Sequence, residues 1–382
     1  MKSRFSLMDW LESRWATPSY SGWLLFALSC CFFGAATNTM AGWLYVLSGM
    51  IFSLLAIGAI MPVRSLRQLK LERFPLQPVS AGEDLTIEIS IKNPTKIPKT
   101  LLQVWDVLPE NLGRPQGTAI ELIPPQGSHD WHYYLPTQQR GVYHWQDLQL
   151  RTGTPLGLFW CRRTKSLPAK AIVYPQILPL MQCPIVDAIG SEDSPKLQSD
   201  RRYQAATEGI TKTLRPYRYG DSTRLIHWRT SARFDDFKVR ELEIITGGQD
   251  IVIAVDSAIT WQTESFEQAV IAAASLYFYA TRCQLNVKLW TAGSGLQHGT
   301  RTVLETLAAI QLGEAQCHEI PAKIPLLWLT NSVNNLDFLA TYSRWLYFPQ
   351  NDMTYPRAST LASGLVIDLT QPLAQQLQKP LR

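Results

Sequence analysis

A run of 49 residues without a charged side chain, Trp15–Val63, constrains this 382-residue chain more than any other feature. The run is too long for a signal peptide, whose apolar region covers about 7–15 residues. It is long enough for two helices of about 20 residues, each able to cross a hydrocarbon core of about 30 Å. A polar break at Thr37–Met40 predicts a transmembrane helical hairpin over 20–61, with helices near 20–36 and 41–61.

Basic residues flank this hairpin but do not interrupt it. They are Lys2, Arg4, Arg14, Arg64, Arg67, Lys70 and Arg73. Cytoplasmic segments carry the excess of Lys and Arg in membrane proteins. We therefore expect a multi-pass protein of the plasma (inner) membrane with both termini in the cytoplasm and residues 1–19 as a cytoplasmic N-terminus. The alternative is a buried helical hairpin of a soluble domain.

The period of the apolar residues changes to two in the region 75–180. Leu85, Ile87, Ile89 and Ile91 alternate with polar residues, and Asn93-Pro94 ends the run. Further short apolar segments occur at 101–107, 130–135, 142–151 and 171–174. Short strands at such spacing, without a good helix among them, predict a small antiparallel β-sandwich.

A strongly basic segment follows an expected linker at 181–205. Between Lys196 and Arg240 there are eleven Lys and Arg against five Asp and Glu, although the whole chain has a net charge of only +5. Such a segment could follow a nucleic-acid backbone, lie on anionic lipid headgroups, or supply internal struts and partner contacts. We favour the third reading and expect no nucleic-acid partner, because the arginines alternate with packing residues such as Ile226 and Trp228. His227 is interpreted as a hydrogen-bonded strut.

The C-terminal residues alternate between strand and helix patterns. Ile251–Val255 is an uninterrupted apolar run typical of a strand buried on both faces. A capping box at Ser265–Gln268 is expected to open a helix over 266–283. Further strands are expected at 285–290, 325–330, 345–348 and 364–369, with a helix at 301–312. This alternation predicts a doubly wound parallel sheet, so that 206–382 forms a basic segment plus an α/β domain.

No chemistry motif accompanies these elements. Phosphate-binding, dinucleotide-binding, zinc-protease and nucleophile-elbow patterns are all absent from the sequence. The six cysteines show no zinc-ligand spacing and are interpreted as small buried apolar residues. We therefore expect no cofactor and no enzymatic activity.

Eleven residues of the basic segment stand at fixed spacings. They are Arg215, Tyr217, Gly220, Asp221, Arg224, Ile226, Trp228, Arg229, Ser231, Ala232 and Arg233, followed by Val239–Glu243. This pattern resembles the signature R-x-Y-x-x-G-D-x-x-R-x-I-x-W-[RK]-x-[ST]-A-R and V-[RK]-E-x-E of DUF58, a family of unknown function. Arg140–Tyr143 and Pro155–Phe159 are similar to two upstream elements of that family, although Thr154 stands where the family has Asp.

The resemblance implies a C-terminal domain similar to a von Willebrand factor A domain. Such domains often hold a divalent cation through D-x-S-x-S and residues of two later loops, whereas Ala258 and Thr260 stand here at the two Ser positions. The weak candidates for cation ligands are Asp256, Ser257 and Thr330, and no metal is expected. The family is often encoded with MoxR-type AAA+ ATPases, and its members are thought to assist the assembly of other proteins.

Together these observations favour a non-catalytic, membrane-anchored interaction protein that contacts the lipid bilayer and acts with a MoxR-type ATPase. The expected partner-binding residues are Arg215, Tyr217, Gly220, Asp221, Arg224, His227, Trp228, Arg229, Ser231, Arg233, Arg240 and Glu241. Their arginines either bind partner carboxylates or hold the signature against the sheet, with Asp221 and Glu241 as counter-ions. The alternatives are a cation-dependent ligand-binding or adhesion domain, or a hydrolase.

Overall fold

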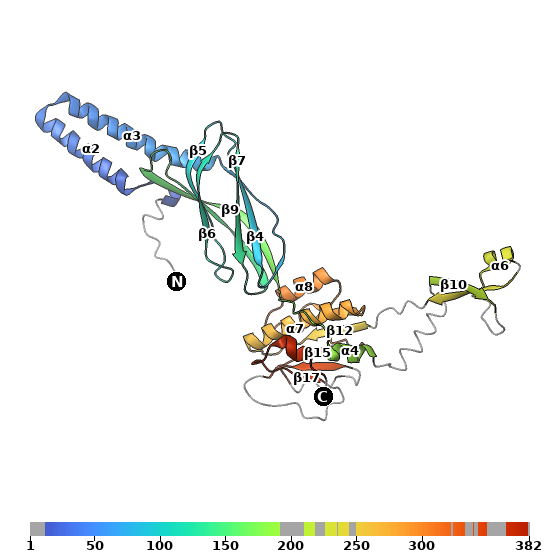
Figure 1. The fold of residues 1–382 in the computed structure, drawn as a ribbon. Coiled ribbons are helices and arrows are strands. Elements are labelled where there is room, and N and C mark those ends of the chain that lie inside the picture. The colour runs from blue at the N-terminus through green and yellow to red at the C-terminus, as the bar shows by residue number, and fades with distance from the viewer. Residues whose placement is uncertain are drawn as a thin grey trace. The chain divides into compact units, whose positions relative to one another are not determined.

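The chain divides into two compact units, Met1–Tyr174 and Pro175–Arg382 (Figure 1). The computed structural model describes residues 12–191, 210–217, 226–234, 236–243, 250–321, 324–332, 339, 343–349 and 364–380. Each unit is described by itself below.

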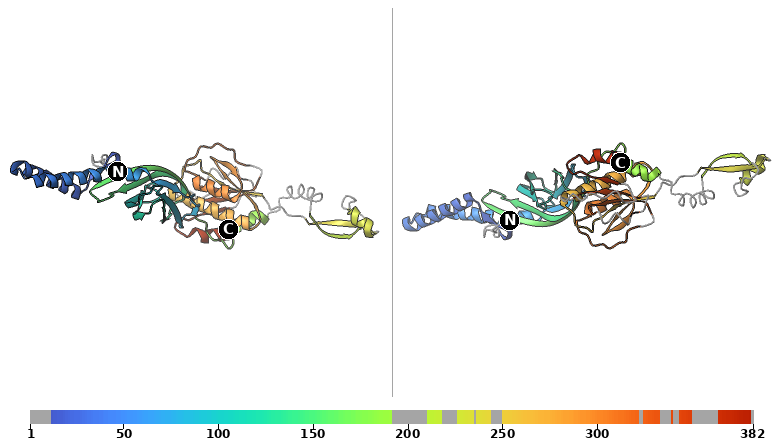
Figure 2. Two further views of the ribbon diagram at one scale, coloured as in Figure 1. Left: turned by 90° about the horizontal axis from the view of Figure 1, so that it is seen from above. Right: turned by 90° about the horizontal axis from the view of Figure 1, so that it is seen from below.

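Two helices of membrane-spanning length begin the first unit. They are α2 (Tyr20–Thr39) and α3 (Gly42–Arg67), which lie side by side in all three views (Figures 1 and 2). Both are long and apolar enough to cross a membrane, and most of their side chains are exposed. The expectation of two apolar helices is thus confirmed.

Small side chains lie where the two helices meet. Ser29 and Ala36 are buried on α2 and Ser48 on α3, whereas Gly22, the third buried residue of α2, lies against Leu158. The Ser29 hydroxyl donates to the carbonyl oxygen of Ser48 at 3.1 Å. Small residues let two helix backbones approach closely, which is how helices associate where the surroundings are as apolar as the side chains.

Antiparallel sheets follow the helices, as expected. One sheet has the order β2-β4-β7, and the other has the order β1-β9-β8-β5-β6 with β3 beside β9. Their bounds are β1 (Thr17–Pro18), β2 (Lys70–Arg73), β3 (Val79–Ser80), β4 (Asp84–Lys92), β5 (Lys99–Asp106), β6 (Gln116–Ile123), β7 (Ser128–Pro136), β8 (Gly141–Thr152) and β9 (Phe159–Tyr174). All the strand pairs are antiparallel except β3 with β9.

The core of these sheets extends beyond the expected bounds of 75–180. Leu85, Ile87, Ile89 and Ile91 are fully buried, which confirms the alternation seen in the sequence. Leu66 of α3 belongs to the same core. The second helix therefore continues past its expected end at 61, because its last turn buries apolar side chains among the strands. At the other end the strands stop at Tyr174.

A buried ion pair lies between the sheets of this unit. The side chains of Arg73 and Asp106 are both buried, and Nη1 of Arg73 lies 2.8 Å from Oδ2 of Asp106. Tyr133 donates its hydroxyl to Asp106 at 2.7 Å, and the Trp145 indole donates to the same carboxylate at 3.0 Å. Burial, followed by the Asp106 charge, raises the pKa of Tyr133 well above its usual range. The phenol therefore remains a donor to this carboxylate.

The second unit contains a mixed six-stranded sheet of order β14-β13-β12-β15-β16-β17. Only β14 is antiparallel to its neighbour. The strands are β12 (Asp250–Val255), β13 (Asn286–Thr291), β14 (Gly295–Gln297), β15 (Leu326–Thr330), β16 (Arg344–Tyr347) and β17 (Gly364–Val366). The helices packed on it are α4 (Pro184–Ser191), α7 (Thr263–Arg282), α8 (Thr300–Ala309) and α9 (Leu373–Leu377).

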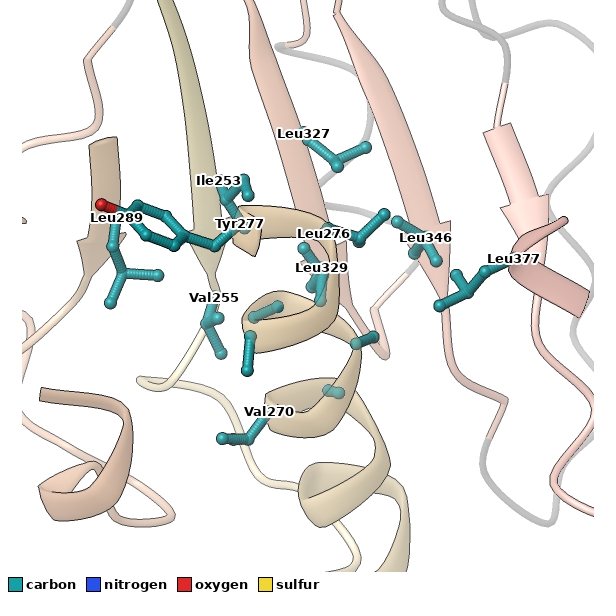
Figure 3. Close-up of a cluster of buried hydrophobic side chains, with 14 of the residues drawn as sticks. Ile253, Val255, Val270, Leu276, Tyr277, Leu289, Leu327, Leu329, Leu346 and Leu377 are labelled. Atoms are coloured by element: carbon teal, nitrogen blue, oxygen red, sulfur yellow. The ribbon is translucent and has the colours of Figure 1, made fainter. Parts of the chain in front are cut away.

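Helices α4, α7, α8 and α9 pack into one core, on one face of the sheet. Figure 3 shows α7 lying across Ile253, Val255 and Leu329 of that face. The other face carries a separate cluster in which the Trp290 and Trp328 rings stack at 5.6 Å. Among the described residues no helix packs on this second cluster, so the expected doubly wound arrangement, which needs helices on both faces of the sheet, is not confirmed. The described residues 310–321 after α8 form no helix, which is consistent with Gly313 and Pro321.

Two local expectations need correction. The expected linker at 181–205 begins with α4, whose Val186 and Ile189 are buried in the core of the second unit. Its Asp187 accepts a hydrogen bond from the Tyr279 hydroxyl at 2.9 Å. The helix α7 begins three residues earlier than the expected 266, and its N-cap is Gln262 rather than a capping box at Ser265. The reason is burial, since Ser265 points into the core.

The cysteines differ in exposure, contrary to the expectation that all are buried. Cys161 and Cys183 are buried, whereas Cys283 and Cys317 are exposed. Burial raises the pKa of the Cys183 thiol to about 12. Because the thiolate is the reactive form, we expect a maleimide at mildly alkaline pH to modify Cys283 and Cys317 but neither buried thiol. Mass spectrometry of the labelled peptides checks this, and modification of Cys183 in the folded chain would contradict it.

Candidate functional site

Those signature residues that the structure describes lie in one local element. Strands β10 (Ile210–Pro216) and β11 (Lys238–Glu243) pair antiparallel, and α6 (Trp228–Phe234) precedes β11. Ile226, which precedes α6, pairs with Val239 of β11 in an isolated antiparallel backbone bridge, and both side chains are buried. Residues that the sequence pattern grouped are thus brought together on a single hairpin with a helical turn.

The start of α6 is held by hydrogen bonds from the signature itself. The ring nitrogen Nδ1 of His227 lies 3.2 Å from the backbone N–H of Thr230, which donates to it, and 2.7 Å from the Thr230 hydroxyl. The Ser231 hydroxyl donates to the His227 carbonyl at 3.1 Å and accepts from the backbone N–H of Lys238 at 2.9 Å. These contacts agree with the reading of His227 as a strut and connect the helix to β11.

The outer side of this element carries aromatic rings and arginines. Trp228 is 61% exposed and Phe237 is 54% exposed, and their rings meet edge to face at 6.2 Å. The Tyr217 ring also meets the Phe237 ring, with 6.2 Å between the ring centroids. Arg229 and Arg233 are exposed one helical turn apart. We name Tyr217, Trp228, Arg229, Arg233 and Phe237 the aromatic–arginine patch.

Sequence reasoning missed Phe237. Several residues that it did predict are not described by the structure. The signal for Phe237 was a lone aromatic residue between Asp236 and Lys238, which form an ion pair at 2.9 Å beside it. Gly220, Asp221 and Arg224 lie outside the described residues. The side chains of Arg215, Arg240 and Glu241 also lie outside the description, so their ion pairing remains a prediction.

A second set of polar residues gathers at the carboxyl ends of the central strands. Thr330, which ends β15, donates its hydroxyl to Asp256 at 3.2 Å. Ser257 donates to Glu314 at 2.8 Å and accepts from the Ala292 backbone N–H at 3.1 Å. Glu314 reaches this edge from the loop after α8, and sequence reasoning did not single it out. Asp256, Ser257 and Thr330 are all buried.

This set pairs largely within itself. Each of the two hydroxyls that would serve a cation already donates to a carboxylate. Within the described ranges, no group of three or more His, Cys, Asp or Glu side chains could hold a metal ion. The arrangement is that of hydrogen-bonded caps on strand ends, which is how Asp256 was interpreted from the sequence.

These features describe a chain with two helices of membrane-spanning length, antiparallel sheets, and a mixed α/β unit with an arginine-bearing hairpin. Residues 213–325 match the family described as "Protein of unknown function DUF58". The chain is also similar to "Uncharacterized protein YeaD" of Bacillus subtilis (strain 168), with 24% identity over 223 residues. That alignment covers 57% of this chain and 54% of YeaD, so it spans about half the length of the relative. The predicted resemblance is confirmed over these residues.

Similarities to solved structures are slight. The CARDB domain of the PF1109 protein from Pyrococcus furiosus is 13% identical, with 27% of this chain and 93% of that chain covered and a TM-score of 0.20. A beta-glucosidase from Listeria innocua is 16% identical, with 29% of this chain and 16% of that chain covered and a TM-score of 0.19. Neither similarity carries an argument about this chain.

Proposed function

We propose that this chain is a non-catalytic interaction protein, anchored in the plasma (inner) membrane by α2 and α3, that docks a MoxR-type AAA+ ATPase during the assembly of other proteins. The observation that carries the proposal is the aromatic–arginine patch. Its Trp228 and Phe237 rings and its arginine side chains are exposed on the signature hairpin.

The composition of the patch supports docking. Tyr, Trp and Arg are the residues most enriched at the centres of protein interfaces. The contacts of His227 and Ser231 hold Trp228 and Arg229 in place before any partner arrives, which lowers the ordering cost of binding. A matching partner surface would combine carboxylates with an apolar recess.

Charge placement supports the orientation. Arg64 and Arg67 lie in the last turn of α3, and Arg14 precedes α2, while the connection between the helices has no charged residue. By the excess of basic residues on the cytoplasmic side, both termini of this multi-pass protein face the cytoplasm. The patch then lies on the side of the membrane where an AAA+ ATPase has access to ATP.

Strand order supports a von Willebrand factor A-like fold for the second unit. Numbered from β12 along the chain, the sheet reads 3-2-1-4-5-6, the order of a doubly wound sheet. The strand numbered 3 is β14, which lies at one edge of the sheet and is antiparallel to β13. The fold would make the sheet a scaffold that presents the hairpin rather than a catalytic domain.

Reversing the patch charges should abolish docking. We expect the double variant Arg229→Glu, Arg233→Glu to lose its crosslinks to the ATPase, because partner carboxylates would then face carboxylates. Arg301→Glu is the matched control, since Arg301 is an exposed helical arginine of the same unit outside the patch. In-membrane crosslinking with mass spectrometry compares the two with the native chain. An unchanged partner list in the double variant would make the arginines structural.

The alternative function, cation-dependent ligand binding or adhesion at Asp256, Ser257 and Thr330, makes a different prediction. If the hydroxyls remain committed to Asp256 and Glu314, titration with magnesium or manganese at millimolar concentration should release no heat of binding. Isothermal titration calorimetry of the native chain and of Asp256→Ala provides the test. A saturable heat that disappears in Asp256→Ala would favour the alternative over the docking proposal.

A further inference from the structure

The tip of one hairpin in the first unit has no charged side chain, like the greater part of α2 and α3. It joins β8 to β9, and from Thr152 to Cys161 it has no charged side chain. Arg151 and Arg162 flank this uncharged stretch on either side. We name residues 154–160 the β8–β9 tip.

The tip is attached to the beginning of α2. Strand β1 pairs with the start of β9, with Thr17 opposite Trp160 and Pro18 opposite Phe159. The backbone N–H of Ser19, the N-cap of α2, donates to the carbonyl oxygen of Leu158 at 2.8 Å. Gly22 approaches so closely that an added Cβ would collide with the same carbonyl oxygen. The tip therefore lies at the first turn of the helix.

The tip also reaches the apolar part of α3. A Cβ added at Gly58 would lie 3.3 Å from Cδ2 of Phe159 and 3.8 Å from Cβ of Leu158. The first charged residue after Gly58 is Arg64, six positions later (64 − 58). Six residues correspond to about 9 Å along a helix. The tip thus extends beyond the charged end of α3, alongside its uncharged run.

Side chains around the tip follow the order of a bilayer interface. Leu156, within the tip, is 54% exposed, and the aromatic residues Trp15 and Tyr20 are exposed close to it in the chain that leads into α2. Behind them, the Arg151 guanidinium lies over the Trp160 ring at 4.5 Å and pairs with Glu12 at 2.5 Å. An apolar apex, then aromatic rings, then charged groups is the arrangement found where proteins meet headgroups.

We propose that the β8–β9 tip inserts into the lipid leaflet next to the β-sandwich, as a third membrane contact beside α2 and α3. The inference rests on the membrane anchoring proposed above, because the helices are what bring Leu156 to the level of the acyl chains. Lipid is the occupant that fits, since the neighbouring helix surfaces at this level are themselves exposed and apolar. The sandwich then lies directly on the bilayer.

Fluorescence quenching in vesicles tests the insertion. The exposed thiols Cys30, Cys31, Cys283 and Cys317 are first replaced by Ala, and the chain without an added cysteine must remain unlabelled. A single cysteine labelled with the dye NBD is then introduced as Leu156→Cys, Leu24→Cys or Tyr134→Cys. The full chain alone is reconstituted in phosphatidylcholine and phosphatidylglycerol vesicles with a spin label near the headgroups or at the end of the acyl chain.

The two controls are matched to the tip. Leu24 lies near the start of α2 and is 53% exposed, close to the value for Leu156. Tyr134 is exposed on β7, two residues before its end at Pro136. That end is joined through residues 81–82 and Thr137 to Tyr174, the end of β9 opposite the tip.

We expect the label at position 156 to shift its emission to the blue and to be quenched by the shallow spin label as strongly as the label at position 24. The label at position 134 should change in neither respect. If the label at position 156 behaves like the label at position 134 while the label at position 24 is quenched, the proposed insertion is wrong and the membrane anchoring stands. The exposed tip would then be a surface for a protein partner. If position 24 is not quenched, the anchor fails and the insertion fails with it.

Discussion

Asp106→Ala is expected to lower the free energy of unfolding of the first unit by about 3–5 kcal/mol. The carboxylate is buried, and its removal leaves the buried Arg73 guanidinium without a counter-charge. It also removes the acceptor of the Tyr133 hydroxyl and of the Trp145 indole. Urea unfolding of the detergent-solubilised chain, followed by amide hydrogen exchange in β4 and β8, measures the loss.

The surface pair Lys92–Glu72 serves as the control for this result. It joins the neighbouring strands β4 and β2 at 2.5 Å, but both side chains are largely exposed. Exposed ion pairs contribute little because water and salt screen them. We expect Glu72→Ala to leave the unfolding curve nearly unchanged. Equal effects of Glu72→Ala and Asp106→Ala would show that the buried pair does not hold the sandwich together.

Leu66→Ala is expected to destabilise the same unit by about 2–5 kcal/mol, although Leu66 belongs to a helix of membrane-spanning length. The side chain is fully buried among the strands, so its truncation removes apolar contacts and leaves a cavity. The same unfolding experiment measures the change. A loss of this size would mean that the last turn of α3 and the sandwich unfold together.

Leu54→Ala is the matched control on the same helix. Leu54 is 40% exposed and lies in the apolar part of α3, so lipid or detergent replaces the contacts that its truncation removes. We expect little change in the stability of the sandwich. If Leu54→Ala and Leu66→Ala have the same effect, the helix end is not part of the core.

Sequence periodicity located most elements because each signal is local. The uncharged run ending at Val63 predicted both helices, and the alternation of Leu85–Ile91 predicted a strand whose apolar side is buried. Element ends were predicted less well. The start of α7 was misplaced because the buried Ser265 looks, in sequence, like an exposed cap.

The candidate site was predicted in part for the same reason. The fixed spacings of the signature identified Trp228, Arg229 and Arg233, which the structure places on α6 and leaves exposed. Phe237 was missed because a single aromatic residue has no period. Glu314 was missed because it meets Ser257 only through a contact across 57 positions of the chain (314 − 257).

The sequence by itself determined the order of the parts: an uncharged pair of helices, alternating strands, a basic signature and a buried β-branched run. Tertiary structure alone decided that Arg73 pairs with Asp106, that α4, α7, α8 and α9 cover one face of the C-terminal sheet, and that the β8–β9 tip packs against Gly22 and Gly58. The physical reason is distance along the chain. Periodic burial depends on residues that are neighbours in the sequence, whereas these contacts join segments that come together only when the whole unit is packed.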